Sequence, residues 1–292
     1  MKTNATFEAR SGRDCSHGRV RFASWKSVPL RAGFSLVDLL VLVVLLGLLG
    51  GWIAHAHTGE RGRIARCAGN LEALGRAMQS FDNEHNDGLP PAAIDLEKTR
   101  IGWYADLFPY LDPKWAQAVS EYDKQQHWWV LQPWFLCPSD PGKRGGHPCS
   151  YAMPAHAMTS ENWPPSSANA TGIGLWWDET TVSALLGSDM VTKAEQDPEV
   201  LPRLKLSVLP DPANTSLLTE LIARDNTLNN ITNTRVEGVE EQQALYKGNL
   251  KRFHFGRFNY LMADGHVELL TGLQTGGGGD APAGIWTIKT GD

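Results

Sequence analysis

The hydrophobic pattern begins with one unbroken apolar stretch. Nearly every residue from Leu36 to Ala54 is apolar, and about 20 such residues span the hydrocarbon core of a bilayer. We therefore predict a membrane-spanning helix over residues 34–57. Its acidic residue is Asp38, and since a carboxylate at mid-bilayer depth costs about 2.5–3.5 kcal/mol, Asp38 is expected to have a partner in the working state.

The helical pattern continues beyond the apolar stretch. Apolar residues recur at steps of three and four from Ile64 to Phe81, while the arginines of this segment fall mostly on other faces. An amphipathic outer helix is predicted over residues 58–88. It should end at Asn86-Asp87-Gly88, where Gly88 suits a left-handed turn and the following prolines block continuation.

Residues 89–292 have a different texture. Short hydrophobic runs alternate with Pro, Gly, Asp and Asn, which is typical of strands and loops. Leu204–Val208 and Leu217–Ile222 are predicted strands, and Asp225–Gly248 is predicted to be an exposed excursion. The sequence therefore indicates an α+β fold in which a long N-terminal helix packs on an antiparallel β-sheet.

The clearest strand pair lies near the end of this region. Residues 259–263 and 266–270 flank Asp264-Gly265, and an Asp-Gly dipeptide between two such runs is a strong hairpin signal. Both turn residues are expected to take positive φ.

The residues before the apolar stretch are basic. Residues 1–33 contain seven Lys or Arg residues and two acidic ones, so removing them from a chain of formal charge −5 leaves about −10. Positive flanks stay in the cytoplasm. We expect a single-pass inner-membrane protein with a cytoplasmic N-terminus and a periplasmic or extracellular C-terminal head. The acidic charge of that head argues against nucleic acid as a partner.

Other kinds of segment compete with a processed membrane helix. A cleaved secretory signal has a shorter apolar core, and a buried helix of a soluble protein is least expected at this length. A plain signal anchor explains the basic flank and the span. It does not explain Gly33-Phe34 or Asp38.

The sequence RAGFSLVD at residues 31–38 resembles the prepilin signal of type IV pilins and type II secretion pseudopilins. In that family a prepilin peptidase cuts between Gly and Phe, here Gly33 and Phe34, and the new terminal amine is methylated. Family members usually have Glu five residues after the cut, a place that Asp38 takes here with one methylene less. The resemblance implies that Asp38 meets the amine of a neighbouring subunit, so other pilin-like subunits are expected partners.

Later segments resemble a family of pilin-like proteins from Planctomycetes and related bacteria. His254 is followed after nine residues by Asp264-Gly265, which matches the H-X9-DG motif near the C-terminus of those proteins. Further matches are the stalk segment Cys67–Gly75, the central segment Phe135–Asp140 and the strand lead Leu209–Glu220. Together they imply a pilin-like subunit of a secretion or pilus machine, and they indicate no cargo.

The cysteines are Cys15 in the basic leader and Cys67, Cys137 and Cys149 in the exported part. Disulfides persist outside the cytoplasm. We favour Cys137 with Cys149, because they bracket a loop without a core of its own, and such a bridge would stabilise the fold by roughly 3 kcal/mol. A Cys67–Cys137 bridge stays open, since spacing cannot decide. Zinc through Cys137, His147 and Cys149 is less favoured because a fourth ligand is missing.

An enzyme hypothesis would start from His254, Asp264 and His266, drawn as metal ligands or as an acid and base. Asp264 fits the hairpin turn, and adjacent strand positions point to opposite faces. We therefore expect structural roles, a non-enzymatic protein and no bound metal or cofactor. Acidic loops such as residues 189–199 could bind Ca²⁺, but they lack the spacing of a known calcium loop.

The chain contains 11 tryptophans, with doublets at Trp128-Trp129 and Trp176-Trp177. Aromatic faces bind sugars, although large rings are more often buried. The expected function is a structural subunit that is processed by prepilin peptidase and assembled into a type IV pilus or type II secretion pseudopilus. The alternative is a membrane-tethered binding module, for example for polysaccharide, that does not polymerise.

Overall fold

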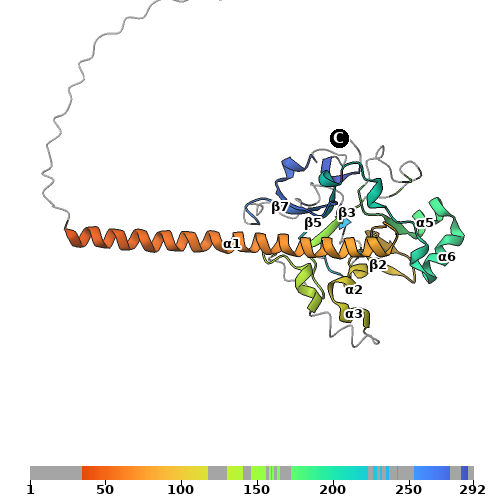
Figure 1. Ribbon diagram of the computed structural model, residues 1–292, viewed down its shortest axis with the longest axis horizontal. Helices are drawn as coiled ribbons and strands as arrows, with labels where there is room; N and C mark the ends of the chain where they lie inside the picture. The colour runs from red at the N-terminus through yellow and green to blue at the C-terminus, as the bar shows by residue number, and fades with distance from the viewer. Residues whose placement is uncertain are drawn as a thin grey trace, which may run out of the picture. The chain divides into compact units, whose positions relative to one another are not determined.

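The structure is a computed structural model (Figure 1). The chain divides after Gly51 into two compact units, and each is described by itself below. The structure describes residues 35–117, 130–140, 146–155, 158, 160, 163–164, 172–222, 226–228, 231, 235–236, 242, 253–276 and 284–288, without the side chains of residues 54–58 and 116.

The described part of the first unit is the beginning of helix α1, which runs from Leu36 to Glu84 without a break at Gly47, Gly50 or Gly51. Its window Leu36–Ile53 is long and apolar enough to cross a membrane, and none of that window is buried. The apolar stretch is therefore confirmed as one helix that can span a bilayer by length and composition.

In the second unit the outer part of α1 supplies core residues. Cys67, Leu71, Leu74, Met78 and Phe81 are almost completely buried, as the helical periodicity predicts. Arg61, Arg63, Arg66 and Arg76 are exposed. The amphipathic helix is thus confirmed.

The end of α1 differs in detail from the prediction. The left-handed residues are Asn86, with φ 57°, and Asp87, with φ 66°, whereas Gly88 was expected to take that role. Asn and Asp tolerate this conformation because their short polar side chains bond locally. The amide of Asp87 donates to the carbonyl of Asp82 at 3.0 Å, which closes the helix.

The main sheet has five strands in the order β6-β3-β5-β7-β8. Its strands are β3 (Tyr151–Pro154), β5 (Ser216–Glu220), β6 (Arg235–Val236), β7 (Phe258–Met262) and β8 (Val267–Leu270). The pairs β3–β5, β5–β7 and β7–β8 are antiparallel, as predicted. The edge pair β3–β6 is parallel, so the sheet is mixed at this edge, and the predicted α+β fold is confirmed.

Helix α1 passes along this sheet, as Figure 1 shows beside β3, β5 and β7. A Cβ on Gly75 would lie 2.9 Å from Cδ1 of Leu261 in β7, so the helix backbone approaches the sheet closely at this glycine. The hydroxyl of Tyr151 in β3 donates to the Cys67 carbonyl at 3.4 Å. The predicted packing of helix on sheet is confirmed within the second unit.

A smaller sheet of order β2-β1-β4 and short helices complete the second unit. Strand β1 (Ala93–Asp95) pairs antiparallel with β2 (Arg100–Gly102) and parallel with β4 (Trp176–Asp178). Among the residues that the structure describes, the other α-helices are α2 (Phe108–Leu111), α3 (Pro113–Gln117), α5 (Glu179–Leu186) and α6 (Ser188–Gln196). Short 3-10 helices are η1 (Ala105–Leu107), η2 (Gln132–Phe135), η3 (Pro198–Val200), η4 (Leu206–Val208), η5 (Pro212–Asn214), η8 (Gly272–Thr275) and η9 (Gly284–Trp286).

Several predicted segments take other forms. The strand expected at Leu217–Ile222 is confirmed as β5, whereas the one expected at Leu204–Val208 is mostly the 3-10 helix η4. The acidic segment 189–199 is not a loop, because most of it lies in α6. The excursion predicted for Asp225–Gly248 is not exposed at Asn226, Val236 and Gln242, which are completely buried.

The hairpin is confirmed, with Tyr260 opposite Glu268 and Leu261 opposite Val267. Its turn differs from the prediction, because Gly265 takes positive φ, at 96°, and Asp264 does not. The Met262 amide donates to the His266 carbonyl at 2.8 Å across three turn residues. A three-residue turn with glycine in its last position needs only that one left-handed residue.

Replacing Gly265 by Ala is expected to destabilise the protein by about 1–3 kcal/mol, because a side chain is strained at this φ and its Cβ would lie 2.7 Å from Nε2 of Gln79. Gly69→Ala is the matched control. A Cβ there meets nothing within 4 Å on α1, and Ala favours helix by about 0.5–1 kcal/mol. Urea unfolding of the full chain in mild detergent measures both, and a Gly265→Ala variant as stable as the parent would contradict the turn geometry.

Candidate functional site

The start of α1 holds Asp38 in a reciprocal cap. The Asp38 carboxylate accepts from the Ser35 amide at 3.0 Å, and the Ser35 hydroxyl accepts from the Asp38 amide at 3.2 Å. This capping box satisfies two helix-end donors that would otherwise be unpaired. Gly33 and Phe34, the predicted processing residues, lie outside the described residues.

The second unit contains a buried polar group that we call the His254 cluster, formed by Glu60, Glu220, His254 and Asn259. His254 precedes β7 in a turn with φ 44° and is completely buried. Its Nδ1 lies 2.9 Å from Oε1 of Glu60, and its Nε2 lies 2.9 Å from Oε1 of Glu220. One imidazole thereby joins α1 to β5.

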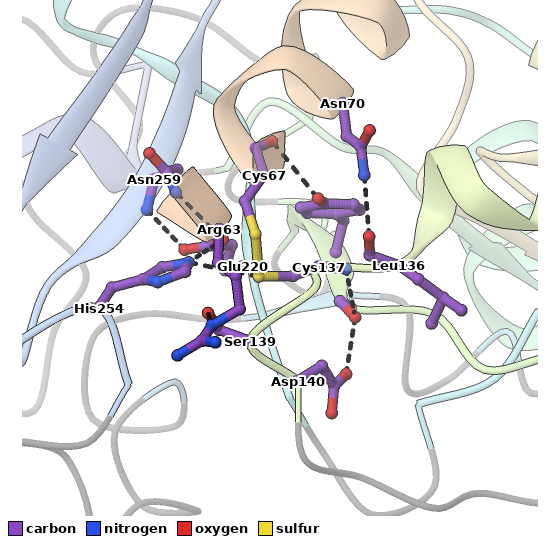
Figure 2. Close-up of a disulfide and its surroundings, with 12 residues drawn as sticks. Arg63, Cys67, Asn70, Leu136, Cys137, Ser139, Asp140, Glu220, His254 and Asn259 are labelled. Atoms are coloured by element: carbon purple, nitrogen blue, oxygen red, sulfur yellow. Dashed lines mark hydrogen bonds and ion pairs between the residues drawn. A yellow bond between two sulfur atoms is a disulfide. The ribbon is translucent and has the colours of Figure 1, made fainter. Parts of the chain in front are cut away.

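Further hydrogen bonds hold both carboxylates in place. Glu220 accepts from the Asn259 amide at 2.7 Å and from its side chain at 3.1 Å (Figure 2). Glu60 accepts from Nε of Arg63 at 2.8 Å and from the Ser139 hydroxyl at 2.8 Å. Buried charges are tolerated when they are paired and hydrogen-bonded in this way.

The disulfide beside this cluster joins Cys67 on α1 to Cys137 (Figure 2). The predicted Cys137–Cys149 pairing was therefore wrong, and the alternative that stayed open is the one observed. Cys149 is buried and stays outside the disulfide, and its Sγ donates to the Tyr151 carbonyl at 3.2 Å. Sγ of Cys137 lies 3.3 Å from Nε2 of His254.

The electrostatics of the cluster favour charged partners. Burial lowers the pKa of His254, but the hydrogen bonds and charges of Glu220 and Glu60 outweigh it, so the pKa is raised above 6.5. Burial raises the pKa of Glu60, whereas hydrogen bonds from His254, Ser139 and Arg63 lower it from 4.5 to about 2. Both carboxylates therefore favour the protonated form of the imidazole.

The sequence segments that carry the family resemblance meet at this place. The stalk segment supplies Cys67 and also Asn70, whose side chain donates to the Leu136 carbonyl at 2.8 Å. The central segment supplies Cys137 and Ser139. The strand lead ends at Glu220 and the H-X9-DG motif begins at His254, so segments far apart in sequence form one buried contact.

The other residues of the enzyme hypothesis form a separate contact. Oδ1 of Asp264 lies 2.6 Å from Nδ1 of His266 and accepts from the His266 amide at 3.1 Å. The two side chains do converge. Adjacent strand positions point to opposite faces, whereas residues two positions apart point to the same face. Among the described residues, no hydrogen bond joins either of them to His254. Within the H-X9-DG motif, His254 connects α1 to β5, and Asp264-Gly265 forms the hairpin turn.

The tryptophan doublet in β4 divides between core and surface. Trp177 is buried and makes an edge contact with Trp163 at 5.1 Å between ring centroids. Trp176 is half-buried, and the Arg235 guanidinium lies 3.7 Å from its ring centroid. Arginine thus covers a face that a sugar would need. Trp128-Trp129 lies outside the described residues.

A second acidic group lies on the surface near the segment considered for Ca²⁺. Carboxylate oxygens of Glu97, Glu179 and Glu195 lie within 4.8 Å of one another. Lys98 pairs with Glu195 at 2.8 Å, and this hydrogen bond raises the pKa of Lys98. The lysine neutralises part of this charge. Calcium binding by residues 189–199 stays a prediction from sequence.

Sequence reasoning identified His254 and both disulfide cysteines but missed Glu60 and Glu220. Glu60 falls in the polar stretch after the apolar span, and Glu220 ends a strand. The available signal was that Glu220 closes one of the segments that resemble the family. All five residues of β5, Glu220 included, are buried.

Comparison with known proteins supports part of the resemblance. Residues 59–195 match the family described as "Protein of unknown function (DUF1559)". The matched residues include Glu60, Cys67 and Cys137, and they end before Glu220 and His254. No curated protein and no solved structure matches the chain.

Replacing Cys67 and Cys137 by Ser is expected to destabilise the protein by about 4 kcal/mol, because the bridge closes a loop with a sequence separation of 70. Urea unfolding of the full chain measures the loss. Cys149→Ala should leave the cross-link intact in peptides mapped without reduction. Recovery of a Cys137–Cys149 peptide from the parent protein would contradict the observed pairing.

The stability of the oxidised protein is expected to depend on pH through the His254 cluster. The raised pKa of His254 means that its contribution is complete below 6.5 and is lost as the pH rises through the folded pKa. The lowered pKa of Glu60 contributes above 4.5, and this contribution is lost as the pH falls towards about 2. Considering these two groups alone, the thermal midpoint should be highest between pH 4.5 and pH 6.5 and should fall at higher pH.

His254→Gln is the variant that tests this assignment, and it should flatten the alkaline fall of the midpoint. His266→Gln is the comparison variant. Asp264 and Glu268 also raise the pKa of His266, but this ring is 40% exposed, so solvent screening should make its effect on the alkaline fall smaller than that of His254→Gln. An unchanged alkaline slope in His254→Gln would assign the effect to other groups.

Proposed function

We propose that this protein is a non-enzymatic, pilin-like structural subunit of the inner membrane. It is made as a prepilin, cut after Gly33, methylated at Phe34 and assembled through the apolar part of α1 into a pilus or pseudopilus. The observation that carries the proposal is that one helix has an unburied apolar span at Leu36–Ile53 and core residues at Cys67–Phe81.

The unburied apolar span needs a surrounding of lipid or of other helices. Burial of apolar surface contributes about 25 cal/mol of stabilisation per Å². An apolar side chain that stays in water does not gain this free energy. Leu36, Val37 and Leu48 are each more than 60% exposed. A bilayer can cover such a span before assembly, and helices of neighbouring subunits can cover it afterwards.

Asp38 provides the polar contact that assembly of such helices requires. Its capping bond with Ser35 uses one carboxylate oxygen, and a carboxylate accepts about four hydrogen bonds. The remaining capacity and the negative charge suit the terminal amine of a neighbouring subunit. Opposite charges attract strongly where water is scarce.

The His254 cluster gives the head a fixed attachment to the helix that would be built into the polymer. Glu60 and Cys67 lie on α1, and each is tied to residues from the head. A subunit in a filament needs this rigidity because its only link to its neighbours would be the helix. The match of residues 59–195 to the DUF1559 family covers the α1 side of that attachment.

Replacing Gly33 by Leu in the native host is expected to leave an uncut precursor, because the peptidase of this family cuts after glycine. Asp38→Asn should mature normally but fail to polymerise, whereas Asp38→Glu should keep assembly. Intact mass measures maturation, and recovery of sheared or cross-linked polymer measures assembly. The control for maturation is Gly47→Ala, where an added Cβ meets nothing within 4 Å.

The outcomes separate the alternatives. Normal cutting of Gly33→Leu would falsify the peptidase assignment. A mature parent protein that stays monomeric after gentle extraction, and is retained on polysaccharide in a tryptophan-dependent manner, would favour the tethered binding module over the polymer.

A further inference from the structure

The two disulfide cysteines and two neighbouring buried side chains together have the donor atoms of a metal site. Donor atoms of Cys67, Cys137, Glu220 and His254 all lie within 4.8 Å of one another, and all four residues are buried. Nε2 of His254 lies 3.3 Å from Sγ of Cys137 and 2.9 Å from Oε1 of Glu220. Two sulfurs, an imidazole nitrogen and a carboxylate oxygen are a donor set that Zn²⁺ takes in tetrahedral sites.

We propose that reduction of the Cys67–Cys137 disulfide converts this place into a Zn²⁺ site with Cys67, Cys137, His254 and Glu220 as ligands. A dithiol supplies two electrons and two protons, the S–S bond breaks to give two thiols, and the dithiol is oxidised to its own disulfide. Binding of Zn²⁺ then releases the two thiol protons and the proton on Nε2 of His254, since the ligands are the thiolates and an unprotonated ring nitrogen. The disulfide and the metal are alternative cross-links between the same two cysteines.

The surrounding hydrogen bonds already orient the ligands as zinc sites require. Nδ1 of His254 lies 2.9 Å from Glu60 and donates to it, which leaves Nε2 as the ligand atom. Glu60 is fixed in turn by Arg63 and Ser139. Metal-bound histidines usually donate their second ring N–H to a carboxylate in this manner. The support for the ligands is therefore present before any metal binds.

The movements that the site needs are small. Zn–S bonds of about 2.3 Å and Zn–N bonds of about 2.0–2.1 Å in a tetrahedron put sulfur and nitrogen roughly 3.6 Å apart and two sulfurs roughly 3.8 Å apart. The observed Cys137 to His254 distance is 3.3 Å. Separation of the two sulfurs is the main change, and breaking the bond between them permits it.

The charges also suit a divalent cation. Two thiolates and the Glu220 carboxylate bring three negative charges, which Zn²⁺ reduces to one, and the neighbouring Arg63 pairs with Glu60 at the edge of the group. The low dielectric constant of a buried site strengthens the attraction between the metal and its anionic ligands.

Cobalt binding tests the proposal, because Co²⁺ takes the place of Zn²⁺ and is coloured. The full chain with Cys15→Ala, in mild detergent, is reduced with a phosphine, which becomes a phosphine oxide with oxygen from water. It is then freed of metal and titrated with Co²⁺. We expect one Co²⁺ per chain with thiolate charge-transfer and tetrahedral bands, displacement by Zn²⁺, and no such bands from the oxidised chain.

Variants separate this site from other thiols. Cys67→Ala should abolish the bands, His254→Gln should weaken binding at least 10-fold, and Glu60→Gln should weaken it about 10–100-fold as a loss of ligand support. The matched control is Cys149→Ala, which removes the other buried thiol and should bind Co²⁺ like the parent.

A second measurement applies if the reduced protein loses structure and therefore gives no clear Co²⁺ titration. Zn²⁺ should raise the thermal midpoint of the reduced parent, followed by near-ultraviolet circular dichroism, and should leave that of reduced Cys67→Ala unchanged. The proposal is overturned if the reduced parent binds no stoichiometric Co²⁺, if Cys67→Ala binds as tightly, or if Zn²⁺ neither restores nor stabilises the reduced fold.

Discussion

A buried imidazole between two carboxylates is the contact on which the second unit depends. His254 has no exposed surface and lies 2.9 Å from both Glu60 on α1 and Glu220 on β5. Removing the imidazole would leave the completely buried Glu220 carboxylate without its charged partner, at a typical cost of 3–5 kcal/mol. The helix cannot shift along the sheet without breaking this arrangement, and the Cys67–Cys137 bridge fixes the same register covalently.

This contact gives the H-X9-DG motif a physical meaning. Its histidine ties the sheet to the helix, and its Asp-Gly forms the turn that returns β7 into β8. Nine residues are the length needed to run from the buried turn at His254 through β7 to Asp264. The proposed assembly function is supported by the fact that this same helix also carries the apolar span.

Local patterns in the sequence predicted the local structure well. Helical periodicity gave α1 and its buried face, and strand alternation with Asp-Gly gave the hairpin. Contacts between distant segments were not predictable in the same way. The cysteine pairing depended on where Cys67 faces on the helix, and the partners of His254 lie 194 and 34 residues away. Gln242 was predicted to be exposed, but its buried side-chain amide is hydrogen-bonded to Thr219 in β5 and Tyr260 in β7.

The central claim is that the helix is a processed assembly segment whose outer half is locked to the head. The most direct test is the intact mass and terminal sequence of the protein purified from its native membrane without reduction. The account predicts a chain that begins with methylated Phe34 and carries the Cys67–Cys137 cross-link. A chain that retains residues 1–33 would contradict it and would leave a membrane-tethered monomer as the better description.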